Sequence, residues 1–106
     1  MKKNIYFLLI LLLPGFILFV PYSYCAEDGQ ALFQSKCGKC HTQGGGAPVF
    51  SPVKFAAIQW KRFFSRNKHQ RKKDISGEIS SDDLYSIEKF LVDHAADSDQ
   101  PEAAGL

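Results

Sequence analysis

The sequence predicts an all-α domain of about three helices. Three stretches of the chain begin with residue types that favour a helix start, and two of them then carry apolar residues at helical spacing. No stretch alternates apolar and polar residues in the manner of a half-buried strand. A Cys-x-x-Cys-His motif at residues 37–41 falls at the end of the first stretch.

The first helix is expected from about Glu27 to Cys40. Glu27 and Asp28 lie in its opening turn, where the helix dipole favours acidic side chains. Leu32 and Phe33 are its apolar contribution to a core.

The second helix is expected to begin at Ser51-Pro52, because serine is a good N-cap and proline suits the first helical position. One broad apolar stripe then follows at helical spacing: Val53, Ala56, Ala57, Trp60, Phe63 and Phe64.

The third helix is expected to begin at Ser80. Asp83, three residues later, takes the position of the second residue in a motif resembling a capping box. Ile79 and Leu84 flank this cap as a hydrophobic staple. An apolar face continues at intervals of three, four and three through Leu84, Ile87, Leu91 and His94.

The motif at residues 37–41 is typical of covalent haem attachment. Two thiols on one turn of helix can add to the two vinyl groups of a porphyrin, and the adjacent imidazole then lies under the ring, where it can bind iron. The residues therefore predict one haem c, attached through Cys37 and Cys40, with His41 as the proximal iron ligand.

Three other interpretations of the motif fit less well. A thioredoxin-like redox pair would need a βαβ pattern around it, which the sequence lacks. A zinc site would need a second ligand pair, whereas His69 and His94 each stand alone. A disulfide between the two cysteines would leave His41 unexplained.

A Gly-Gly-Gly-Ala-Pro loop follows the motif at residues 44–48 and is too rich in glycine for a helix. It is either a simple flexible turn or a segment whose carbonyl accepts the second ring N–H of His41, which would orient that imidazole. Pro48 is the better candidate to shape this segment, and Pro52 is the alternative.

The N-terminus has the pattern of a secretory signal. A basic start precedes a sixteen-residue apolar run at residues 5–20, and a short, more polar exit ends at Cys25. We expect residues 1–25 to be a signal peptide cleaved before Ala26, which predicts a periplasmic or otherwise exported protein. An uncleaved membrane anchor is the alternative, although spanning a bilayer takes ~20 residues.

The remaining 81 residues predict a single small domain at residues 26–97 and a flexible C-terminal tail at residues 98–106. A core in a domain of this size supplies only ~3–5 kcal/mol, and a covalent haem would add a large apolar centre. The eleven basic and eleven acidic residues left after the signal are balanced in number but not in position.

Seven positive charges without one acid lie between residues 61 and 73: Lys61, Arg62, Arg66, Lys68, Arg71, Lys72 and Lys73. Residues 74–102 hold nine acids against Lys89 alone. The basic segment is either an ordinary solvated face or a docking surface for an acidic redox partner. Nucleic acid is not an expected partner of an exported haem protein.

From residue 26 to about residue 97 the chain resembles the small class I, cytochrome c-like monohaem proteins of bacteria. The resemblance rests on Gly29 and Phe33 ahead of the Cys-x-x-Cys-His motif, the Gly/Pro loop after it, and a Ser-Ser-Asp-Asp-Leu helix start followed by Phe90 and Leu91. It implies a bundle around one haem, in which the first and last helices cross with Gly29 and Phe33 against Phe90. It also implies single-electron transfer rather than enzymatic catalysis.

One departure from that family concerns the second iron ligand. The family supplies a methionine between the haem motif and the last helix, but the only methionine here is Met1. His69 lies in the right stretch and is the first candidate, and His94 near the end of the last helix is a weaker one. A lysine among residues 68, 72 and 73 would first have to lose its proton, and a vacant position is the last alternative.

Two functions fit these residues. A six-coordinate haem would make the protein an electron carrier of low potential, since methionine ligation raises haem potential. An open iron position would instead make it a ligand-binding, peroxidase-like or accessory haem protein, with His69 as a distal acid or base.

Overall fold

The computed structural model describes residues 28–106, and this part of the chain is all-α, as predicted. It holds three α-helices, α2 (Gly29–Lys36), α3 (Ala57–Ser65) and α4 (Ser81–Asp93). Three 3-10 turns, η1 (Cys37–Lys39), η2 (Pro52–Lys54) and η3 (Lys68–Arg71), connect them, and no strand occurs between residues 28 and 106. The signal or anchor expected at residues 1–25 lies outside the described residues.

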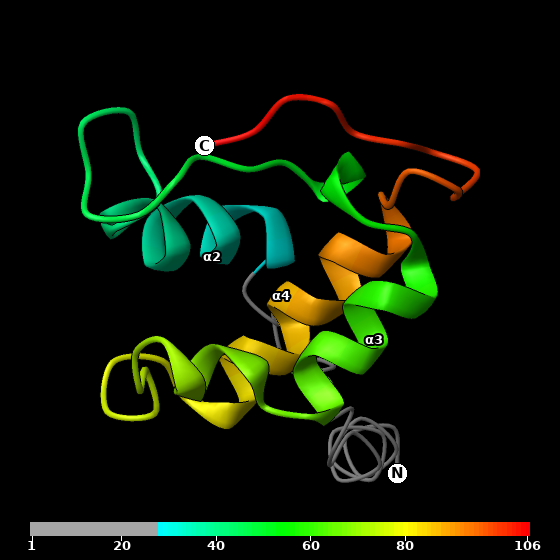
Figure 1. Ribbon diagram of the computed structural model, residues 1–106. Coiled ribbons are helices and arrows are strands. Elements are labelled where there is room, and N and C mark those ends of the chain that lie inside the picture. The colour runs from blue at the N-terminus through cyan, green and yellow to red at the C-terminus, as the bar shows by residue number, and fades with distance from the viewer. Residues whose placement is uncertain (1–27) are drawn as a thin grey trace, which may run out of the picture.

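The helix α4 is the centre of the arrangement, with α2 and α3 both packed against it (Figure 1). Its residues Ile87, Phe90 and Leu91 are buried. The other buried apolar side chains come from all parts of the fold: Leu32, Phe33, Trp60, Ile79 and Ala95. No helix within residues 28–106 has the length and apolar character needed to cross a membrane.

The helices α2 and α4 approach each other closely at Gly29, as expected. A Cβ atom at this position would lie 2.4 Å from the Ser86 carbonyl oxygen and 2.9 Å from Phe90 Cβ. The rings of Phe33 and Phe90 pack beside this contact with centroids 5.5 Å apart. The crossing therefore depends on a residue without a side chain.

The first helix is shorter than predicted. Asp28 is its N-cap, and its carboxylate accepts a hydrogen bond from the Gln30 amide at 3.2 Å. The α-helix ends at Lys36 and tightens into the turn η1, where the His41 amide donates back to the Cys37 carbonyl at 3.0 Å. The Cys-x-x-Cys-His motif thus lies on and just after a 3-10 turn.

The predicted start of the second helix at Ser51-Pro52 is wrong. These residues open only the turn η2, and the chain is extended at Phe55 and Ala56 before α3 begins at Ala57. A segment distant in the sequence stabilises this interruption, because the Phe55 carbonyl accepts a hydrogen bond from the Ala96 amide at 3.1 Å.

The third helix begins as predicted, with Ser80 as the N-cap of α4. The Ser80 hydroxyl accepts a hydrogen bond from the Asp83 amide at 3.1 Å. Asp82 and Asp83 occupy the first turn, where the helix dipole favours negative charge.

The tail at residues 98–106 was expected to have little to bury, but it contributes to the packing. It crosses one end of the molecule and returns toward the loop after α2 (Figure 1). The Glu102 amide donates to the His94 carbonyl at 3.0 Å, and the Leu106 amide donates to the Phe50 carbonyl at 3.1 Å. The side chain of Leu106 packs against the core.

Candidate functional site: an apolar cavity between two histidines

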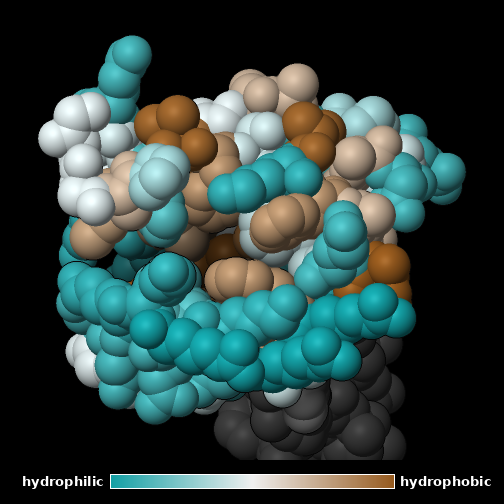
Figure 2. Space-filling view, viewed as in Figure 1, coloured by the Kyte–Doolittle hydropathy of each residue, from teal (hydrophilic) through white to brown (hydrophobic). Residues whose placement is uncertain are grey.

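A cavity of about 990 Å³ opens beside the Cys-x-x-Cys-His motif. Figure 2 shows it as a hollow with apolar surface deep inside and hydrophilic residues along its lower rim. Its volume lies at the upper end of the ~300–1,000 Å³ typical of ligand and cofactor sites. The apolar wall is formed mainly by Phe50, Phe55, Trp60, Phe63, Phe64, Ile75, Ile79, Leu84, Ile87 and Leu91.

Both cysteines of the motif line this cavity and are half-buried. Burial, together with the neighbouring Cys40 thiol, raises the pKa of the Cys37 thiol to about 11. Thiols that exchange disulfides or bind metals have the opposite shift, because their reactive form is the thiolate. As this fold holds it, the Cys37 thiol therefore carries its proton at neutral pH.

The ring of His41 is held in one orientation by the loop that follows it. Its Nδ1–H donates to the Pro48 carbonyl oxygen at 2.7 Å, the contact expected for a carbonyl of this loop. The Phe50 ring packs edge-on against the imidazole with centroids 4.9 Å apart. Pro52, the alternative candidate to shape this segment, forms no hydrogen bond with His41, and its carbonyl accepts from the indole N–H of Trp60 at 2.8 Å. These contacts leave Nε2 as the ring nitrogen available for a ligand.

The loop can reach His41 because it folds tightly back on the motif. The Ala47 amide donates to the Cys40 carbonyl at 2.9 Å. A Cβ atom at Gly45 would lie 2.4 Å from that same carbonyl oxygen. The glycine at this position therefore permits the close approach that brings the Pro48 carbonyl to the Nδ1 edge of the imidazole.

His69 lies on the turn η3 and also lines the cavity. Its Nδ1–H donates to the Lys73 carbonyl oxygen at 2.9 Å, and the Phe63 ring lies edge-on to it with centroids 6.4 Å apart. His69 thus has the same arrangement as His41: one ring nitrogen bonded to a backbone carbonyl, an aromatic neighbour, and Nε2 left over.

The two imidazoles are spaced as two ligands of one metal ion would be. A metal–imidazole nitrogen bond measures ~2.0–2.1 Å, which puts the ring centres of two opposed ligands ~6.3 Å apart. The centroids of His41 and His69 are 6.2 Å apart, and their planes are inclined at 74°. This spacing is compatible with both imidazoles holding one metal ion, and the two cysteines and the apolar wall border the same cavity.

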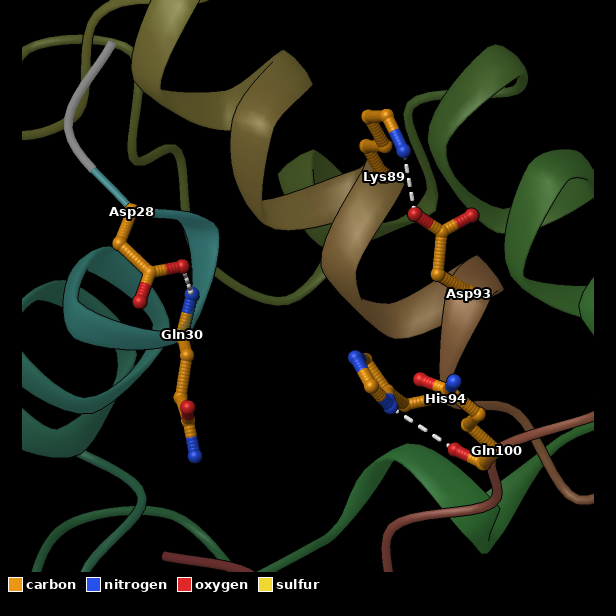
Figure 3. A network of polar contacts seen from close by, with 6 residues as sticks. All are labelled: Asp28, Gln30, Lys89, Asp93, His94 and Gln100. Atoms are coloured by element: carbon orange, nitrogen blue, oxygen red, sulfur yellow. Dashed lines mark hydrogen bonds and ion pairs between the residues drawn. The ribbon is translucent and has the colours of Figure 1, made fainter. Parts of the chain in front are cut away.

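His94 is not part of this site. Its Nδ1–H donates to the Gln100 carbonyl at 2.8 Å, and Figure 3 shows the ring turned toward the C-terminal tail. The ring also packs on Phe90 with centroids 4.9 Å apart. It lines a separate shallow hollow together with residues 97–100. The weaker of the two histidine candidates is thus engaged elsewhere.

The mouth of the cavity is basic. Six cationic side chains contribute to its lining: Lys36, Lys54, Lys68, Arg71, Lys72 and Lys73. Glu78 is the acid among the lining residues, and it pairs with Lys73 at 3.0 Å, a hydrogen bond that raises the pKa of the Lys73 ammonium.

The predicted basic segment at residues 61–73 and the basic lining of the cavity overlap only in part. Lys61, Arg62 and Arg66 do not line the cavity, whereas Lys36 and Lys54 do. Lys54 lies over the rings of Phe50 and Phe55 at 5.7 and 5.5 Å. Lys36 and Lys54 do not belong to a run of charged residues, although Lys36 directly precedes the Cys-x-x-Cys-His motif.

Sequence reasoning also missed Phe50, which contacts His41, Phe33 and Trp60 at once.

Within residues 28–106, no three His, Cys, Asp or Glu residues gather closely enough to hold a metal ion by themselves. Comparison of the chain with family models, with curated proteins and with solved structures finds no match.

Proposed function

We propose that this protein is a monohaem c-type cytochrome that carries single electrons. One haem c would be attached through Cys37 and Cys40, with its iron between His41 and His69. When bound, this group supplies an iron centre that changes its charge by one electron. The observation that carries the proposal is the 6.2 Å spacing of two imidazoles beside a Cys-x-x-Cys-His motif.

The residues of this chain have separate roles in the proposal. His41 and His69 present Nε2, and their hydrogen bonds to Pro48 and Lys73 fix each ring and increase its donor strength. The aromatic wall excludes water from the site. With His41 and His69 both holding the iron, a substrate would have no place at it, which favours electron transfer over catalysis.

Two imidazole ligands place the proposed carrier at a lower potential than the histidine–methionine pair of the family it resembles. The N-terminal signal pattern supports a location outside the cytoplasm, either free in the periplasm or anchored to the outer face of the cytoplasmic membrane. The basic mouth of the cavity supports a partner protein with an acidic docking surface.

The test begins with protein exported by a host that attaches haem c. Mass spectrometry should find the chain heavier by one haem, and Cys37→Ala with Cys40→Ala should abolish the covalent attachment. A bare polypeptide made under these conditions would overturn the proposal.

Absorption spectra then examine the second ligand. The native protein should be six-coordinate and low-spin and should bind carbon monoxide slowly. His69→Ala should give a high-spin haem that binds carbon monoxide readily, whereas the matched variant His94→Ala should leave the spectrum unchanged. A native protein already high-spin and open to carbon monoxide would favour the ligand-binding alternative instead.

A further inference from the structure

Asn67, which lies between α3 and the turn η3, has an unusual backbone conformation. Its φ and ψ angles of 45° and 47° lie in the left-handed region, and it is the only non-glycine residue between 28 and 106 with a positive φ. Side chains of L-residues are disfavoured there, although asparagine tolerates it better than most. Asn67 follows Arg66, the C-cap of α3, and directly precedes the turn η3 that carries His69.

The hydrogen bonds of Asn67 connect these two elements. Its amide donates to the Phe64 carbonyl at 2.9 Å, which closes the last turn of α3. Its carbonyl accepts from the Gln70 amide at 3.3 Å, and its side-chain Nδ2 donates to Gln70 Oε1 at 2.7 Å. One residue therefore ends the helix and begins the turn.

The same turn holds the imidazole. The His69 carbonyl accepts from the amides of Lys72 and Lys73, both at 2.9 Å, and the Lys73 carbonyl accepts from the His69 ring. Helical angles at residue 67 would instead continue α3 along its axis at 1.5 Å per residue. His69 would then leave its place opposite His41.

We propose that Asn67 is a positioning residue, whose left-handed conformation turns the chain after α3 and so sets His69 opposite His41. This inference rests on the proposed function, because its consequence is read at the haem iron. Asn67 also lines the cavity, but its role is exerted through the backbone and needs no contact with the cofactor.

The test compares variants of the full haem-loaded protein that separate the backbone conformation from the side chain. Asn67→Gly keeps easy access to positive φ and loses the bond to Gln70. Asn67→Val makes positive φ costly, and Asn67→Ala is a milder change in the same direction. Arg66→Val is the matched control, since Arg66 is the exposed neighbour with a φ of −94°.

The readout is the rate at which the reduced haem binds carbon monoxide, which requires His69 to leave the iron. We expect Asn67→Val to raise this rate about 5- to 30-fold over Asn67→Gly, from the cost of the left-handed region for a residue with a Cβ. Asn67→Ala should show a smaller increase. Arg66→Val should match the native protein.

Equal rates in Asn67→Val, Asn67→Ala and Asn67→Gly would overturn the inference. If Asn67→Val does not fold, the carbon monoxide binding rates of Asn67→Ala and Asn67→Gly are compared instead. The inference and the proposed function fail in distinguishable ways. If His69→Ala opens the iron but the Asn67 variants do not, only the positioning role is lost. If His69→Ala changes nothing, the ligand assignment itself is wrong.

Discussion

At the scale of single residues, the candidate site holds two imidazoles that are each fixed by a hydrogen bond to a backbone carbonyl. His41 is bonded to a carbonyl seven residues later, and His69 to a carbonyl four residues later. Such bonds select the tautomer with the proton on Nδ1 and leave Nε2 with a lone pair that can bind a metal. Because each bond comes from the local chain, each ring keeps the angle that its own loop imposes.

The angle between the rings leads to a spectroscopic prediction. Their planes are inclined at 74°, which is close to perpendicular. Perpendicular imidazoles act alike on the two iron d orbitals that interact with them, so these orbitals stay nearly equal in energy. We expect the oxidised protein to give a low-spin electron paramagnetic resonance spectrum of the highly anisotropic type, with one very large g value. A rhombic spectrum, typical of parallel rings, would contradict this geometry.

A second residue-scale prediction concerns the close contact of α2 with α4. Gly29→Ala should lower the free energy of unfolding by about 1–3 kcal/mol, the usual cost of overpacking, because its Cβ meets backbone and cannot be relieved by a side-chain rotation. Gly46→Ala is the control, since a Cβ there has nothing within 4 Å. Urea unfolding of both variants measures the difference. Equal stabilities would mean that the crossing is looser than the structure describes.

At the scale of elements, the three helices differ in how their beginnings are specified. The start of α4 depends on Ser80 and a residue three positions later, so it could be predicted from the sequence. The start of α3 depends on Asp97, whose carboxylate accepts from the Ala57 amide at 2.7 Å across forty residues of chain. The sequence around residue 51 contains a good cap signal, but the tertiary contact at residues 55–57 overrides it.

This distant cap can be tested. Asp97→Ala should cost ~1 kcal/mol of stability, the usual value for removing an N-cap acceptor. Asp99→Ala is the matched control, since Asp99 is exposed and forms no hydrogen bond or ion pair with the described residues. Thermal unfolding followed by circular dichroism compares the two. A loss of the same size in both variants would show that general charge, and not the cap, is responsible.

At the scale of the whole molecule, the charges are sorted around the cavity. Lysines and arginines from three separate parts of the chain meet at its mouth, while residues 74–102 hold nine of the acids. Exposed charges of this kind contribute little to stability. They create a field that attracts anions toward the mouth and weakens as salt screens it.

Small redox reagents probe this field without a known partner. Oxidation of the reduced protein by anionic hexacyanoferrate should slow as salt is added, whereas oxidation by a cationic cobalt complex should quicken. Lys68→Glu with Lys72→Glu should slow the anionic reaction several-fold at low salt. Lys61→Glu with Arg62→Glu makes the same change of charge away from the cavity and should have a smaller effect. Equal effects of the two pairs would assign the field to net charge alone.

The close approach of Gly29 to Phe90 was implied by the family resemblance and not by any local pattern. The all-α class, the start of α4 and the Cys-x-x-Cys-His motif could be read from the sequence. These depend on contacts between residues that are close in the sequence, or on a motif whose residue spacing defines its chemistry. The tertiary structure added the 6.2 Å spacing of His69 from His41, the identity of the lysines that surround the cavity and the start of α3. Each of these depends on how distant segments pack against one another, which the residues next to His69, Lys36 or Ala57 do not encode.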